Sequence, residues 1–339
     1  MKSVLLASIA LFSSLTLTSA QLSSLAQQLG LNQTWYAPFP SSPITDSTDA
    51  ASDIKSQWSV PSTSTFFGTS NLEFIQDPFN NSSNDSAVLQ VFYPQGSYSP
   101  SASKTKGASS GGAEFYAQPL GNISYDRALV SYSVGFPANF PWTLGGKLPG
   151  IYGGSPGAGC SGGDQSTGSN CFSMRIMWRQ NDLGEAYAYI PTSSDFCSQS
   201  LIICNDDYGK SIGRGLIQFV AGEWNKIDLY IQLNTVGSSN GLLQVWQNGK
   251  IVINMNDLQY HTTNMVLIES FMFSTFFGGS TSSYAAPQDT YTYFKDIQFS
   301  VGTPVPLSAS VGISRGSLRS LPALVAVVMG VVAVVTFVV

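Results

Sequence analysis

The stretch QVWQNGKIVI, residues 244–253, decides the fold class of this chain. Asn248-Gly249 stands between two apolar runs. Asn-Gly is the favoured sequence for a two-residue turn of type I′, in which both residues take a positive φ. The stretch therefore predicts a β-hairpin.

The same pattern continues outward from the hairpin in both directions. Short apolar runs alternate with clusters of turn residues, and none shows the 3.6-residue period of an amphipathic helix. The predicted strands are residues 87–93, 112–118, 128–136, 173–179, 185–190, 215–220, 225–233, 241–247, 251–255, 267–277 and 290–299. We therefore expect an all-β fold, a β-jelly roll sandwich of two antiparallel sheets, over residues 21–302.

Three segments lie outside these runs. Residues 21–70 are rich in Ser, Thr and Pro, and we expect them to wrap the edge of the domain. Residues 153–170 and 278–283 are rich in Gly and Ser, and we expect them to overhang one face of a sheet.

Charge and length limit the classes of partner. The net charge is −5 and the isoelectric point is about 4.8. Nucleic acid needs a basic surface, so this balance argues against it as a partner. A local group of Lys and Arg can still bind an acidic ligand. The 339 residues contain no internal repeat, and we expect one domain and a monomer.

Both ends of the sequence carry processing signals. Residues 1–20 form a basic start, an apolar run and a small-residue exit, which is typical of a cleaved secretory signal peptide. Residues 303–320 read as a stalk with a lipid attachment site between positions 308 and 314, and residues 321–339 are an uncharged apolar tail. This order predicts a glycosylphosphatidylinositol anchor on the outer leaflet of a eukaryotic plasma membrane or in its cell wall. A transmembrane helix is the alternative.

The cysteines indicate an oxidising compartment. They are Cys160, Cys171, Cys197 and Cys204. Three pairings exist, and the local one, 160–171 with 197–204, is favoured because each bond closes a short loop. Their spacing fits no zinc finger and His261 is distant, so no metal is expected.

Sequons for N-glycosylation point to the same compartment. They occur at Asn32, Asn80, Asn81, Asn84 and Asn122. Glycans require exposed positions, so we expect these segments at the surface.

A set of polar side chains marks the middle third of the chain. Lys147 lies in GGKLPG, residues 145–150. Ser173 and Arg175 are two residues apart, as are Tyr187 and Tyr189, so on strands each pair faces one side of the sheet. Cations, phenols and a hydroxyl on one face would bind an acidic sugar.

These residues carry a resemblance to a known family. The matching elements are YSVGF (132–136), GGKLPGIYGG (145–154), Ser173-x-Arg175, Tyr187-x-Tyr189 and YFKDI (293–297). In this order they resemble polysaccharide lyase family 14, of a secreted fungal type, across residues 87–301. The resemblance implies a β-jelly roll, lyase activity on alginate or glucuronan, and an active site lined by the five polar side chains. The cysteine-bearing loops 153–171 and 196–204 depart from the family pattern and put the substrate in question.

The chemistry of elimination assigns roles to the same side chains. The sugar carboxylate must be neutralised, and Arg175 suits a bidentate pair. A base must remove the C5 proton, for which Lys147 or a tyrosinate serves, and burial beside another cation lowers a lysine pKa. Tyr187 or Tyr189 would protonate the leaving O4, and we expect nearby cations to lower the phenol pKa. Ser173 would hold a sugar hydroxyl or the carboxylate. We favour Lys147 as base or carboxylate partner and Tyr187 as acid, without cofactor or metal.

Several residues also have a structural interpretation. Arg175 would then pair with Asp182 or Glu185, and the tyrosines would pack across strands. His261 reads as a surface loop residue. Trp142 borders the Lys147 segment and is the best candidate for stacking on sugar.

Two other functions remain open at this point. A glycoside hydrolase would need two carboxylates facing each other across the groove, and Glu185 and Glu223 are unpaired in the sequence. A carbohydrate-binding cell-surface protein would keep the groove and the aromatics without the lysine and tyrosines. A single histidine and no Gly-x-Ser-x-Gly turn argue against a serine hydrolase.

Overall fold

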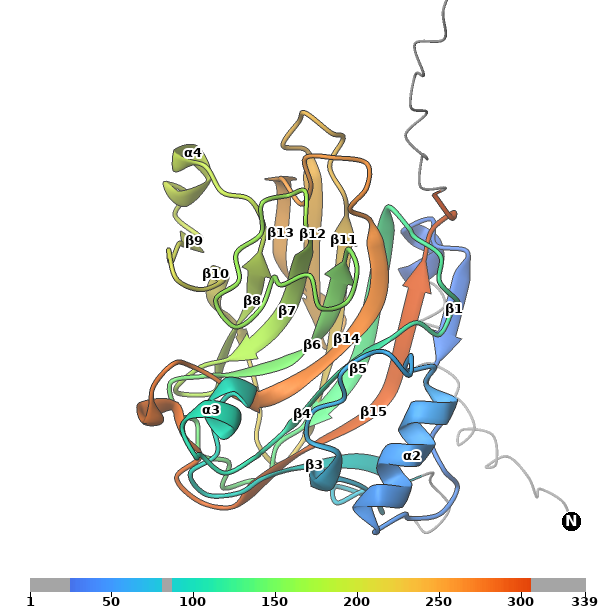
Figure 1. Cartoon of the computed structure of the whole chain (residues 1–339), viewed down its shortest axis with the longest axis vertical. Coiled ribbons are helices and arrows are strands. Elements are labelled where there is room, and N and C mark those ends of the chain that lie inside the picture. The colour runs from blue at the N-terminus through green and yellow to red at the C-terminus, as the bar shows by residue number, and fades with distance from the viewer. Residues whose placement is uncertain (1–24, 81–86, 306–339) are drawn as a thin grey trace, which may run out of the picture. The chain divides into compact units, whose positions relative to one another are not determined.

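The computed structural model describes residues 25–80 and 87–305, which form two packed antiparallel sheets (Figure 1). The predicted sandwich is confirmed. The signal peptide, the stalk from residue 306 onward, the apolar tail, Asn81 and Asn84 lie outside the described residues. Within the described part, no helix is long and apolar enough to cross a membrane.

The first sheet has the strand order β13-β12-β11-β5-β15-β3-β2, with β1 also paired to β15. Its strands are β1 (Gln33–Tyr36), β2 (Leu72–Ile75), β3 (Val88–Tyr93), β5 (Arg127–Gly135), β11 (Trp224–Gln232), β12 (Gly241–Gln247), β13 (Lys250–Leu258) and β15 (Thr290–Val301).

The second sheet has the order β4-β14-β6-β7-β8-β10-β9. Its strands are β4 (Ala113–Ala117), β6 (Gly146–Gly153), β7 (Phe172–Trp178), β8 (Leu183–Tyr189), β9 (Ile202–Ile203), β10 (Lys210–Gln218) and β14 (Ile268–Phe277). Short helices accompany the sheets, among them α2 (Ser47–Gln57), α3 (Pro100–Thr105) and α4 (Ser194–Cys197).

The predicted hairpin joins β12 to β13. Gln247 pairs with Lys250, and Asn248 and Gly249 have φ of 50° and 79°. Both positive values are those of the type I′ turn that Asn-Gly favours. The Asn248 side chain also accepts a hydrogen bond from the backbone N–H of Lys226, which ties the turn to β11.

Aromatic side chains fill the space between the sheets. The Phe273 ring of β14 lies 5.1 Å from the Phe294 ring of β15, so the two sheets meet there directly. Phe273 also stacks on Phe115 of β4, with ring centroids 4.9 Å apart. Rings of this size bury a large apolar area and fix the spacing of the layers.

The N-terminal segment contains a helix that the predicted elements did not include. Residues 47–57 form α2, whose N-terminus is capped by the Asp46 side chain. Ala50, Ala51 and Ile54 face the core, and Trp58 behind them is fully buried. The cap and this spacing are ordinary helix signals, and the Ser and Thr content of the segment hid them.

The segment around Lys147 is a strand, β6, which the predicted strands did not include. Every residue of β6 is buried. The register with β7 shifts between Leu148 and Gly150, so Pro149 occupies an irregular position. Proline has no N–H for the ladder and is tolerated at such a bulge.

Candidate active site

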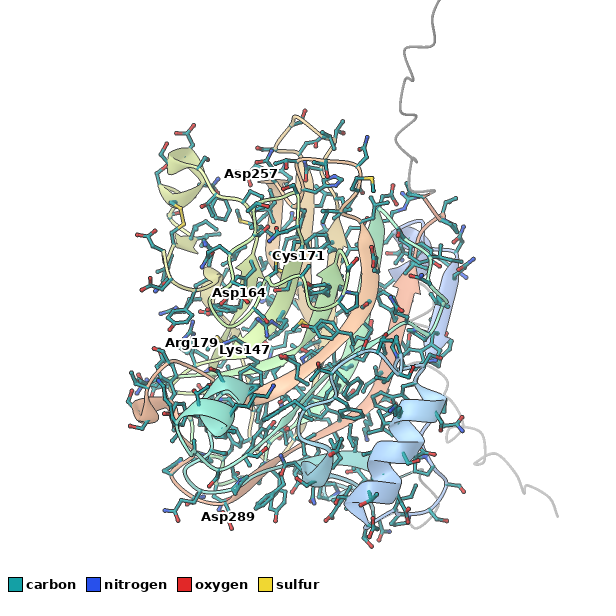
Figure 2. The ribbon with its side chains drawn as sticks, viewed as in Figure 1. Lys147, Asp164, Cys171, Arg179, Asp257 and Asp289 are labelled. Atoms are coloured by element: carbon teal, nitrogen blue, oxygen red, sulfur yellow. A yellow bond between two sulfur atoms is a disulfide. The ribbon has the colours of Figure 1, made fainter. Side chains whose placement is uncertain are left out.

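The outer face of the second sheet carries polar side chains in cross-strand rows. Lys147 of β6 is opposite Met177 of β7, and Arg175 of β7 is opposite Tyr187 of β8. The period of two in each strand therefore gathers residues that are distant in sequence on one face. Figure 2 shows Lys147, Arg179 and Asp164 on this side of the molecule, and all three line one cavity.

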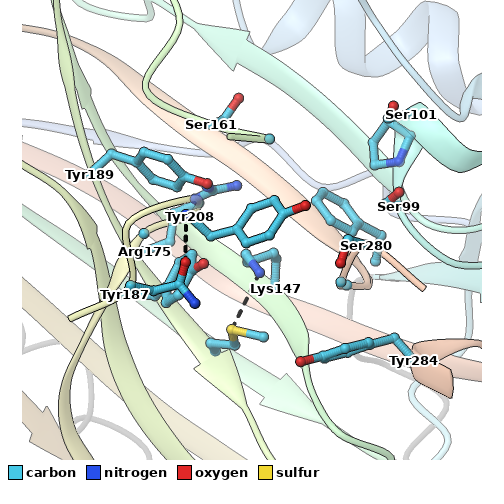
Figure 3. A pocket seen from close by; sticks show the side chains of 18 of the residues that line it. Ser99, Ser101, Lys147, Ser161, Arg175, Tyr187, Tyr189, Tyr208, Ser280 and Tyr284 are labelled. Carbon is cyan, nitrogen blue, oxygen red and sulfur yellow. Dashed lines mark hydrogen bonds between the residues drawn. The ribbon is translucent and has the colours of Figure 1, made fainter. Parts of the chain in front are cut away.

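This cavity has a volume of about 870 Å³ and is shown in Figure 3. Its floor is the sheet face. Its walls come from three places: residues 161–164, residues 203–209, and α3 together with residues 278–284. The two Gly/Ser-rich loops thus overhang the sheet as the sequence predicts.

Lys147 lies at the floor of the cavity with its side chain 7% exposed. Its Nζ is 3.3 Å from the sulfur of Met177 and 4.3 Å from the centroid of the Tyr187 ring. Among the described residues, no carboxylate forms an ion pair with it. Burial, with Arg175 and Arg179 nearby, holds the pKa of Lys147 well below its ordinary value. The amine is therefore suited to accept a proton.

Arg175 is buried and held by a polar chain on its other side. Its Nη1 donates to Ser274 Oγ at 3.1 Å, and Ser274 donates to Glu114 at 2.8 Å. Within the described part of the chain, Arg175 Nε has no hydrogen-bond partner. A buried guanidinium donor without a partner is costly unless a ligand completes it.

Glu185 anchors two further cations beneath the cavity. It is fully buried and accepts hydrogen bonds from Arg179, from Ser211 at 2.6 Å and from Arg214 at 2.7 Å. The interpretation that Arg175 pairs with Glu185 or Asp182 was wrong: Arg175 pairs with Glu114, whose Oε2 is 3.7 Å from its Nη1, and Glu185 pairs with Arg179 and Arg214.

Tyr187 and Tyr189 stand next to each other on β8, with ring centroids 5.9 Å apart. Burial, followed by the neighbouring Tyr189, raises the pKa of Tyr187, against our expectation of a lowered value. Desolvation therefore outweighs the arginines, and Tyr187 keeps its proton. The Tyr189 hydroxyl accepts a hydrogen bond from the backbone N–H of Gly163 at 3.1 Å.

Ser173 lies under the cavity wall, and its role in holding the sugar stays a prediction. It is fully buried, and its Oγ donates to the carbonyl of Cys160 at 2.6 Å. It thus fixes the loop after β6 to the sheet, under the cavity wall, and does not reach the cavity. The disulfides are Cys160–Cys171 and Cys197–Cys204, the local pairing.

Comparison with known proteins places this architecture in a family. The protein-family model for polysaccharide lyase 14 matches residues 81–297 of this chain. The chain belongs to polysaccharide lyase family 14. An alginate lyase from Aplysia kurodai is 35% identical to it, covering 79% of this chain and 99% of that one, with a TM-score of 0.66.

Two further proteins are similar to this family 14 chain at lower identity. An alginate lyase solved with an alginate tetrasaccharide is 20% identical, covers 79% of this chain and 100% of its own, and has a TM-score of 0.57. Exolysin of Paramecium bursaria Chlorella virus 1 is 25% identical over 213 residues, 54% of this chain. That match spans 31% of Exolysin, so it says nothing about the rest of that protein.

Trp142 lies outside the candidate active site. It packs against Phe136, Phe140 and Phe219, with ring centroids 4.7, 4.8 and 6.1 Å away. Among the described residues, the lining of the cavity does not include it. Its ring completes the apolar core at the end of β5, so the expectation of sugar stacking there finds no support in its position.

His261 is buried and not a surface loop residue. Its Nδ1 is 2.7 Å from the carbonyl oxygen of Val266, and its Nε2 is 2.7 Å from that of Asn234. The ring thus ties two connecting segments together, away from the cavity. The sequons at Asn32, Asn80 and Asn122 are exposed, and their glycosylation stays a prediction.

Sequence reasoning missed several groups of the site. They are Glu114, Arg179, Glu185, Tyr208, Ser211 and Arg214. The position of Glu185 two residues before Tyr187 was a usable signal, because both then face one side of β8. The others became visible only with the strand order.

Proposed function

We propose that this chain is a polysaccharide lyase that cleaves a uronic-acid polymer of the alginate or glucuronan type by β-elimination. The observation that carries the proposal is the buried, unpaired amine of Lys147 between a protonated phenol and two guanidinium groups. Family membership and the identity to the Aplysia kurodai alginate lyase support it.

The first step in this scheme is binding of the sugar carboxylate. Arg175 would bind it, because its side chain lines the cavity while Ser274 and Glu114 hold its Nη1 in place. A guanidinium beside the carboxylate stabilises the negative charge that develops when C5 loses its proton.

Lys147 then removes the C5 proton as the neutral amine. The electron pair of the C–H bond forms the C4–C5 double bond, and the C4–O4 bond breaks. Tyr187 gives its proton to O4, so a new chain end and an unsaturated uronate leave the site. A lowered amine pKa and a raised phenol pKa put each group in the protonation state that its role requires.

No metal takes part in this scheme. Residues 25–80 and 87–305 contain no group of three or more His, Cys, Asp or Glu side chains that could hold an ion. Metal independence is proposed because the guanidinium groups of Arg175 and Arg179, which both line the cavity, can supply the positive charge themselves.

Two readouts separate the candidate functions. The purified chain is incubated with alginate and with glucuronan, and both ultraviolet absorbance and new reducing ends are measured. Elimination produces a conjugated double bond, so both signals rise together. Reducing ends without absorbance would contradict the proposal and indicate a hydrolase. Retention on a polyuronate column without either signal would indicate a binding protein.

The arrangement of carboxylates disfavours hydrolysis. Glu185 is fully occupied by Arg179, Ser211 and Arg214, and Glu114 is occupied by Ser274 and Arg175. A glycosidase needs a pair of carboxyl groups, one of them free to give its proton to the leaving group, whereas among the described residues that line the cavity Asp164 is the one carboxylate besides Glu114.

We further propose that the protein acts outside the cell, bound to the outer leaflet by a lipid anchor. The signal-like residues 1–20, the tail 321–339 and the two disulfides support this location. The fungal type and the single-chain state stay predictions of the same kind.

A further inference from the structure

Residues 203–209 form a wall of the cavity that is joined to the loop at 161–165. Lys210 Nζ donates to Gln165 Oε1 at 2.6 Å and to the carbonyl of Tyr208 at 3.3 Å. Gln165 Nε2 donates to the same carbonyl at 3.3 Å. Lys210 is 6% exposed, so these bonds are largely shielded from water. We call this connection the wall cross-link.

Tyr208 stands at the centre of this wall. Its backbone N–H donates to Asn205 Oδ1 at 2.8 Å, and its carbonyl accepts both donors of the wall cross-link. The disulfide of Cys204 and the pairing of Ile203 with Ser211 hold the segment before it. The backbone that presents the ring is therefore fixed before any ligand arrives.

The ring of Tyr208 is free to meet a ligand. Figure 3 shows it reaching into the cavity that Lys147, Tyr187 and Tyr284 also line. Within the described residues its hydroxyl has no hydrogen-bond partner. An aromatic face binds the apolar C–H face of a pyranose, and a tyrosine on a fixed backbone has only its two χ angles to order on binding.

We propose that Tyr208 is a substrate-binding residue that stacks on a sugar ring of the bound acidic polysaccharide. This inference rests on the proposed function and adds a binding contact to it. The contact exists before and during bond cleavage, so it contributes to binding and not selectively to the transition state.

The first test compares steady-state kinetics on alginate or glucuronan, whichever polymer the chain cleaves. Tyr208→Ala is expected to raise KM about tenfold and to leave kcat within about twofold. Tyr208→Phe keeps the ring and is expected to recover most of the affinity. Tyr36→Ala, a tyrosine 56% exposed on β1, is the matched control. A fall in kcat at constant KM, or no change in either constant, would overturn the proposal.

The wall cross-link is tested by a double-mutant cycle. Lys210→Met removes both of its hydrogen bonds while keeping the length of the side chain. If the cross-link acts by positioning Tyr208, Lys210→Met raises KM less than Tyr208→Ala, and the double variant has the KM of Tyr208→Ala alone. Additive effects of the two substitutions on KM would show that Lys210 does not act through Tyr208.

Failure of the proposed function is distinguishable from failure of this inference. If the unaltered chain forms no unsaturated product, its affinity for mannuronate and glucuronate tetrasaccharides is measured by calorimetry. Binding that weakens about tenfold in Tyr208→Ala would still support the stacking role. Equal affinity of both proteins, or no binding by the unaltered chain, would overturn it.

Discussion

Lys147 experiences opposing influences on its protonation. The faces of Tyr187 and Phe276, 4.3 and 5.9 Å from Nζ, favour the cation. Burial and the guanidinium groups of Arg175 and Arg179 favour the neutral amine, and burial is the largest influence. The net effect lowers the pKa of Lys147, so its amine is more readily neutral and able to take a proton. The cost is that the protonated form is poorly solvated in the buried site.

The pH dependence of activity follows from these two residues. We expect kcat/KM to rise with pH as Lys147 loses its proton, and to reach its plateau well below the ordinary lysine value of 10.5. Since burial raises the pKa of Tyr187, the acid stays protonated and no decline accompanies the plateau. Rates measured from about pH 5 to about pH 10 check this. Activity that is greatest in acid and falls through neutrality would contradict the assignment.

Lys147 should lower the stability of the fold, although it serves the reaction. The unfolded chain keeps the ordinary lysine pKa, so protonation favours unfolding. The penalty is absent above the unfolded pKa, grows as pH falls, and is constant below the folded pKa. Lys147→Met should therefore raise the free energy of unfolding by ~1 kcal/mol at neutral pH and by little at strongly alkaline pH.

Urea unfolding of both proteins at several pH values measures this difference. A Lys147→Met protein that is less stable than the original at neutral pH would show that the amine is not a burden to the fold.

The sequence predicts only some of the residues of the site. Lys147, Arg175, Tyr187 and Tyr189 follow from their order and from spacing by two, and the structure brings them together around one cavity. Ser173 shares their face, but whether the loop covers it depends on the path of residues 154–171, which no local pattern specifies.

At the scale of elements, the turn from β9 to β10 sets the position of the two tyrosines. A Cβ built on Gly209 would be 2.7 Å from the Tyr187 ring and 2.8 Å from the Tyr189 ring. Both distances are shorter than real contacts allow, and buried rings cannot easily move. Gly209 is therefore needed for the close approach of the turn to β8.

Gly209→Ala should displace Tyr187 and reduce kcat by ~10- to 100-fold, because small shifts of catalytic groups are costly. The fold should survive with a loss of about 1–3 kcal/mol. Asp207→Ala, exposed in the same loop, is the control. Steady-state kinetics measure the change in kcat for both variants, and circular dichroism shows whether each keeps the fold. Full activity in Gly209→Ala would show that the contact is not needed.

Most of the strands could be predicted from the sequence, whereas strand β6 and helix α2 could not. Alternating apolar runs and the Asn-Gly turn indicate most of both sheets, because pairing in each depends on a period of two. β6 escaped because Pro149 marks a bulge that reads locally as a turn. Helix α2 was not predicted because its signals are one N-cap residue and three buried apolar positions in an otherwise polar segment.

At the scale of the whole molecule, the cavity opposes the net charge. The chain carries −5 overall, yet the cavity is lined by the basic residues Lys104, Lys106, Lys147, Arg175, Arg179 and Arg214 and by two carboxylates, Glu114 and Asp164. Composition cannot predict this concentration, because the contributing strands and loops are far apart in sequence. A local field of this sign suits a polyanion even on an acidic protein.

The most direct test of the central claim is the formation of unsaturated uronate, followed by ultraviolet absorbance, for the unaltered chain and two lysine variants. We predict that Lys147→Met lowers the rate by ~10²–10⁴-fold, while Lys250→Met, at an exposed hairpin position, leaves it unchanged. Product formation by Lys147→Met at the rate of the unaltered chain would contradict the claim that Lys147 removes the C5 proton.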